Sequence, residues 1–134
     1  MQDKPAIETL ISAVSLFIKD VASPALSGRA LFHARVAQNV LSVIEREAVY
    51  GFRFSSAQHA RLCKLLDMDS DLETLNNELC ARIKDGRLSA DDVRPHLRKA
   101  TMGKLAIDQP NYAGYRRAQE LGWAEEDGYP TTAD

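Results

Sequence analysis

The chain has 134 residues, of which 45% are hydrophobic and 27% charged, a balance typical of one globular domain rather than a disordered or fibrous chain. Its formal net charge of -2 argues against the basic surface that nucleic-acid binding requires. It contains no apolar run of the roughly 20 residues that a membrane span needs, and its polar start predicts no secretion signal. We therefore expect a cytoplasmic protein that binds neither nucleic acid nor a membrane.

Two long amphipathic segments open the chain. The first begins behind Pro5, which a first helical turn tolerates, and should end before Ser23-Pro24, because a residue that precedes proline avoids the α region. The second is expected to run from residue 27 or 28 to Tyr50, with Gly51 as its left-handed C-terminal residue. In both segments, apolar residues recur at helical spacing. They are Ile7, Leu10, Ile11, Val14, Phe17, Ile18 and Val21 in the first, and Phe32, Val36, Val40, Val43 and Ile44 in the second.

Shorter helices are expected in the middle of the chain. A serine at position 55 or 56 offers an N-cap for a helix that the acidic stretch 67–71 should end. Ser70 and Glu73 have the spacing of a capping box, which predicts that the next helix begins there. Gly86 is expected to end that helix, because glycine readily adopts the left-handed conformation of a helix C-terminus.

The remaining elements are also predicted to be helical. Ser89 should cap a helix in which Pro95 predicts a late start or an early kink, and residues 108–110 should end it. A last helix is expected over residues 111–121, ending at Gly122, followed by a loosely ordered acidic tail over residues 123–134. No segment alternates with a period of two for long enough to form a sheet. The sequence therefore predicts an all-α fold, a single-domain bundle of five or six helices over residues 1–122.

Polar side chains interrupt the apolar face of the second helix. Arg29, His33 and Glu47 project at the same angle as the valines, and Asn39 lies at the edge of that face. Arg29 and His33 are one turn apart and can meet, whereas Glu47 is roughly 20 Å further along the helix axis. Glu47 must therefore find a partner on another helix or lie where the face reaches solvent. Two interpretations stay open: these groups form hydrogen bonds and ion pairs in the core, or Arg29 and His33 line a pocket for an anionic ligand.

Two further polar residues lie among apolar ones on later helices. Asn76 can fix the register of its helix. Lys104 either extends its ammonium into water or acts as a second cation for a ligand. His59 and Cys63 are four residues apart on one helix face, but a zinc site would need more ligands from elsewhere. We predict no metal and no cofactor.

The segment 28–41, GRALFHARVAQNVL, together with Gln2-Asp3-Lys4-Pro5 and residues 104–112, KLAIDQPNY, resembles a family of small bacterial helical proteins that carries a domain-of-unknown-function label. Its genes often neighbour those of aminoglycoside-phosphotransferase-like kinases and acyl-CoA dehydrogenases. The resemblance implies a cytoplasmic bacterial protein, an accessory to a small-molecule or acyl-CoA catabolic system. It also draws attention to Arg29, His33, Arg35, Asn39, Lys104 and Asn111.

Two hypotheses of function follow. The first is a non-enzymatic helical module that binds a protein partner, either a second copy as a homodimer or a neighbouring kinase or acyl-CoA dehydrogenase. The alternative is a binding protein or small enzyme for an anionic acyl or phosphorylated metabolite, held by Arg29 and His33, with Asn39 and Lys104 as further candidate ligand-binding residues. The sequence shows no recognised catalytic arrangement and leaves open whether the chain is an enzyme.

Overall fold

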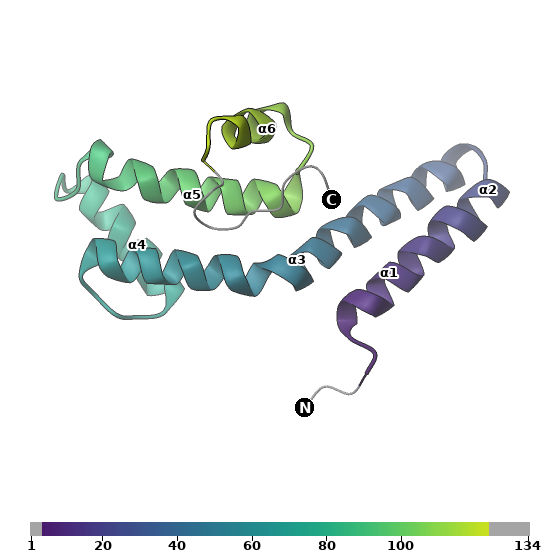
Figure 1. Cartoon of the computed structure of the whole chain (residues 1–134), viewed down its shortest axis with the longest axis horizontal. Coiled ribbons are helices and arrows are strands. Elements are labelled where there is room, and N and C mark those ends of the chain that lie inside the picture. The colour runs from purple at the N-terminus through teal and green to yellow at the C-terminus, as the bar shows by residue number, and fades with distance from the viewer. Residues whose placement is uncertain (1–3, 124–134) are drawn as a thin grey trace. The chain divides into compact units, whose positions relative to one another are not determined.

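The computed structural model describes residues 4–123, and every regular element among them is helical. The predicted all-α fold is therefore confirmed. The elements are α1 (Ile7–Phe17), a π-helical segment η1 (Ile18–Ala22), α2 (Ser23–Ala25), α3 (Gly28–Leu66), α4 (Leu72–Lys84), α5 (Ala90–Asp108) and α6 (Ala113–Glu120) (Figure 1). None of these helices combines the length and the apolar character that crossing a bilayer requires. The chain divides into two compact units, Met1–Phe52 and Arg53–Asp134.

The first helical segment continues past its predicted end at Ser23-Pro24. The α-helix α1 gives way to the π-helical turn η1 at Ile18, and the chain stays helical to Ala25. Pro24 lies in the first turn of α2, a helical position that tolerates proline. The chain leaves the helix at Leu26, whose φ of -106° and ψ of 155° are extended.

The predicted break at Gly51 is absent, because α3 runs through that position without interruption to Leu66. The serines at 55 and 56 are consequently interior helical residues and not caps. A single glycine inside a helix costs only about 1 kcal/mol relative to alanine, too little to end a helix whose flanking turns are both favourable. Residues of α3 up to Phe52 belong to the first unit, and those from Arg53 onward belong to the second.

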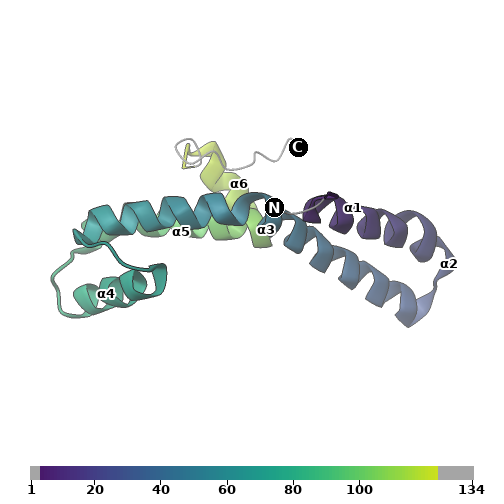
Figure 2. The same ribbon diagram turned by 90° about the horizontal axis from the view of Figure 1, so that it is seen from below.

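In the first unit, α1 lies beside the N-terminal half of α3 (Figures 1 and 2). Among the residues described in this unit, Ile11 of α1 is the one buried apolar residue. The half-buried side of α3 carries Leu31, Ala34, Gln38, Leu41, Ser42 and Glu45. This side is opposite to the apolar face predicted from the sequence, which is exposed at Phe32 (62%), Val36 (42%), Val40 (52%) and Ile44 (44%).

The second unit has an apolar core made by the C-terminal half of α3 together with α4, α5 and α6. One cluster of buried side chains joins the first three helices, and the other joins α5 to α6. Their members are Leu62, Leu66, Leu75, Leu79 and Val93 in the first and Met102, Ala106, Tyr115 and Ala118 in the second. The two clusters therefore hold α3, α4, α5 and α6 together in this unit.

Local capping signals set the helix ends in this unit. Ser89 and Asp92 form a reciprocal capping box at the start of α5, as predicted for Ser89. Gly86, at a φ of 71°, follows α4 as predicted, and the N–H of Arg87 donates to the carbonyl of Arg82 at 2.9 Å, the pattern of a glycine-terminated helix. The predicted start of α4 is wrong by one residue, because Asp71 is the N-cap and accepts the Thr74 backbone N–H at 2.9 Å.

At the carboxyl end of the described chain, α6 covers a shorter range than the predicted 111–121, and Gly122 follows it with a φ of 76°. Trp123 packs against Arg98, and the guanidinium carbon of Arg98 is 4.5 Å from the centroid of the Trp123 ring. The rest of the predicted acidic tail, residues 124–134, lies outside the described residues.

Candidate functional site

The exposed apolar face of α3 is the first candidate site, and we call it the α3 stripe. Its apolar members are spaced three or four residues apart, and polar members lie at both of its ends. At 100° per residue, all of them project within an arc of about 120°. The stripe consists of Arg29, Phe32, His33, Val36, Val40, Val43, Ile44 and Glu47. An amphipathic helix ordinarily buries such a face, but here the opposite face of α3 lies against α1.

Arg29 and His33 meet as the sequence predicted, since Nε of Arg29 donates to Nε2 of His33 at 3.3 Å. The ring of Phe32 lies edge-on to the imidazole, with 5.6 Å between the ring centroids. The prediction that polar groups of this face are forced into a core is wrong for Arg29, His33 and Asn39, which are all exposed. Glu47 is exposed too, which is one of the two outcomes expected for it. The physical reason is that α1 covers the other side of α3. Ligand binding by Arg29, His33 and Asn39 stays a prediction.

The other polar residues that interrupt apolar patterns lie in the second unit. Lys104 is exposed on α5, as expected for a lysine that extends its ammonium into water. It is not among the residues that line the groove described next. Asn76 is half-buried, and its amide donates to the carbonyl of Leu72 at 2.8 Å, so its polar group is satisfied within α4.

An apolar groove of about 740 Å³ is the second candidate site. The side chains that line it come from the end of α4, from α5 and from the α6 region. They include Leu88, Val93, Leu97, Met102, Leu105 and Trp123, together with the cations Arg94 and Arg98. This volume is within the range of small-molecule sites, which are mostly apolar with a few polar groups. The groove was not predicted, because its walls come from consecutive helices whose packing on one another is not contained in their periodicity.

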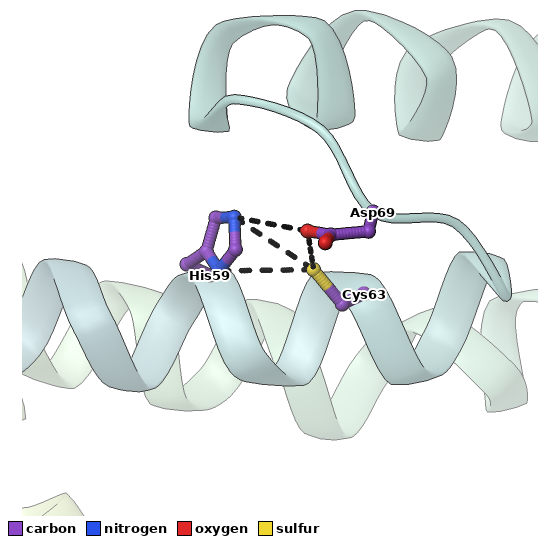
Figure 3. A group of neighbouring side chains, drawn as sticks. All are labelled: His59, Cys63 and Asp69. Atoms are coloured by element: carbon purple, nitrogen blue, oxygen red, sulfur yellow. Dashed lines mark hydrogen bonds and ion pairs between the residues drawn. The ribbon is translucent and has the colours of Figure 1, made fainter.

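The third candidate site is a cluster of three potential metal ligands, His59, Cys63 and Asp69 (Figure 3). His59 and Cys63 are one turn apart on α3, as the sequence showed, while Asp69 comes from the loop between α3 and α4. The Sγ atom of Cys63 is 3.7 Å from Nδ1 of His59 and 3.7 Å from Oδ1 of Asp69. No sequence pattern singles out Asp69 from its acidic stretch, because only the path of the loop returns it to α3.

The second unit also buries a histidine, His96. Its side chain is buried at 6% exposure on α5, and Nδ1 has no hydrogen-bond partner among the described residues. Burial lowers the pKa of His96 below its usual value, and the positive charge of Arg61 lowers that pKa further. The imidazole is therefore held neutral in the folded protein near pH 7.

Comparison with known protein families shows which family the chain matches. A family model described as domain of unknown function (DUF6285) matches residues 24–112, which is more than half of the sequence. The chain belongs to this family. The matched segment contains α3, α4 and α5 entire, and so the α3 stripe and the His59 cluster. No curated protein and no solved structure matches the chain.

Proposed function

We propose that this DUF6285 protein is a non-enzymatic helical interaction module that forms a homodimer through the α3 stripe. The observation that supports the proposal is the exposure of Phe32, Val36, Val40 and Ile44 in one row on a helix whose other face is half-buried. Exposed contiguous apolar surface marks interaction sites. A second copy of the same stripe is the partner that matches it best, for reasons of register and charge.

The register follows from placing two α3 helices antiparallel about position 38. Val36 of each copy then lies opposite Val40 of the other, and Phe32 lies opposite Ile44. Each residue near one end of the stripe thus contacts the partner's residue near the other end. The same contacts occur in both halves of the interface, as two-fold symmetry requires. Each of the four exposed apolar members thus has an apolar partner, while the half-buried Val43 lies opposite His33.

The charges at the ends of the stripe fit the same register. Arg29 of each copy lies opposite Glu47 of the other, so the dimer gains two equivalent pairs of opposite charge. A parallel arrangement would instead bring Arg29 against Arg29 and Glu47 against Glu47, and like charges in contact disfavour a complex. Charge therefore selects the antiparallel dimer over the parallel one.

Sedimentation equilibrium of the full chain and of charge-swapped variants tests the proposal. We expect a dimer that Arg29→Glu or Glu47→Arg weakens, and that the double variant restores because the ion pairs are re-formed with reversed sign. Arg35→Glu is the matched control, since Arg35 is exposed on α3 outside the stripe. A monomeric wild-type chain, or a double variant no stronger than the single ones, would contradict the dimer.

The cellular role that we propose comes from the family resemblance. The dimer would act in the bacterial cytoplasm as an accessory to a small-molecule or acyl-CoA catabolic system, beside a kinase or an acyl-CoA dehydrogenase encoded nearby. Co-purification from the native host tests this role. We expect such an enzyme to be recovered with the wild-type chain. Recovery of the same enzyme with unrelated bait proteins would refute a specific association.

The groove in the second unit supports a second candidate function, the binding of an anionic ligand with an apolar chain. Its apolar walls suit the chain, and Arg94 or Arg98 suits the carboxylate or phosphate. This proposal moves the predicted anionic acyl site away from Arg29 and His33. Calorimetric titration with a medium-chain carboxylate should show binding that the alcohol of equal length lacks; equal binding of the two would contradict a role for the arginines.

A further inference from the structure

The cluster of His59, Cys63 and Asp69 shares no residue with the α3 stripe or with the groove, and neither proposed function uses it. Its three side chains supply one nitrogen, one sulfur and one oxygen, and these atoms all lie within 4.8 Å of one another. The cluster is accessible, because the side chain of His59 is 39% exposed and that of Asp69 is 93% exposed. A small ion can therefore reach all three donor atoms from solvent.

The spacing of the donor atoms suits one tetrahedral ion. Zinc binds nitrogen, oxygen and sulfur at about 2.0–2.3 Å, so that two of its ligands are separated by roughly 3.4–3.7 Å. The Sγ atom of Cys63 is 3.7 Å from both Nδ1 of His59 and Oδ1 of Asp69. The other ring nitrogen of His59, Nε2, is 3.8 Å from the same sulfur and 4.0 Å from the same carboxylate oxygen. The donor side chains are therefore close enough for one ion, and binding through Nδ1 would require the imidazole to rotate so that its lone pair points at that ion.

A hydrogen bond outside the cluster also determines which ring nitrogen of His59 is free to bind a metal. Nε2 of His59 is 2.7 Å from the backbone carbonyl oxygen of Ser70. A carbonyl oxygen can only accept, so Nε2 carries the hydrogen, and the lone pair of the ring is on Nδ1, near Cys63. A metal-binding histidine commonly donates its second ring N–H to a carbonyl in this way.

We propose that His59, Cys63 and Asp69 form a zinc-binding site with three protein ligands, Nδ1, Sγ and a carboxylate oxygen, and with water in the fourth position. The mixed ligand set favours Zn²⁺ over the hard cations Mg²⁺ and Ca²⁺, which prefer oxygen. On binding, the thiol of Cys63 loses its proton to solvent and the thiolate binds the ion. The ion would join the C-terminal turns of α3 to the loop that leads into α4.

The test uses the reduced, metal-free full chain with Co²⁺ as a spectroscopic substitute for Zn²⁺. One equivalent of Co²⁺ should release a proton and produce a thiolate-to-cobalt charge-transfer band. Zn²⁺ should then displace the Co²⁺ and remove the band with no further release of a proton. Cys63→Ser should abolish the band, and Asp69→Asn should weaken Zn²⁺ affinity by at least about tenfold. Cys80→Ser is the matched control, because Cys80 is the other free cysteine, exposed on α4, and it should bind like the wild type.

Three results would overturn the zinc site: no charge-transfer band in the wild type, a band that survives in Cys63→Ser, or a band that Cys80→Ser removes. Unchanged affinity in Asp69→Asn would also overturn it, since the site would then lack its third ligand. Asp69 is exposed in a loop, so this variant keeps the fold, and circular dichroism verifies that it does. The outcome is independent of the dimer, which uses residues of the first unit.

Discussion

Because α3 continues through Gly51, we can predict whether the substitution Gly51→Ala raises or lowers the stability of the fold. Inside a helix, alanine is favoured over glycine by about 1 kcal/mol. A Cβ at this position would meet the carboxylate of Glu47, the far end of an exposed side chain that can rotate into solvent at small cost. We therefore expect the free energy of unfolding to rise by about 0.5–1 kcal/mol. Had Gly51 ended the helix in the left-handed conformation, alanine would instead cost about 1–2 kcal/mol.

Urea denaturation followed by circular dichroism at 222 nm measures this difference, at one fixed protein concentration because association shifts apparent stability. Gly86→Ala is the matched control: Gly86 has a φ of 71° and a Cβ added to it would meet nothing within 4 Å, so the backbone alone should make that variant less stable. A loss of stability in Gly51→Ala similar to that in Gly86→Ala would refute a continuous α3.

Three further predictions concern the second unit. Asp67 follows α3 with a φ of 50°, so Asp67→Gly should raise the free energy of unfolding by up to about 1 kcal/mol; a decrease in the urea midpoint would contradict this. The lowered pKa of His96 means that the unfolded chain binds a proton more readily, so stability should fall as pH drops below about 6.5. His96→Leu should reduce this dependence in urea titrations across that pH range, and an unchanged slope would be the opposing result. Tyr115 is fully buried, so Tyr115→Ala should cost about 3–5 kcal/mol, whereas Leu121→Ala, at a 56% exposed position, should cost little; equal effects would show that Tyr115 is not a core residue.

The all-α class and many of the helix ends could be predicted from the amino-acid sequence alone. Ser89, Gly86 and Gly122 act through hydrogen bonds and backbone conformations of their immediate neighbours, which is why local patterns predict them. The contact between Arg29 and His33 was predictable for the same reason, since one helical turn separates them. Such features depend on residues within a few positions along the chain.

Packing between distant segments determines which face of α3 is covered and which loop residue returns to it. Periodicity identifies an apolar face but not its partner, so the sequence could not show that α1 packs on the side of Leu31 and Leu41 and leaves the stripe exposed. A glycine signal at Gly51 could not be weighed against the favourable turns on both sides of it. Asp69 joins His59 only because of the loop path after α3. Contacts of this kind depend on how whole helices fit together, which no local pattern contains.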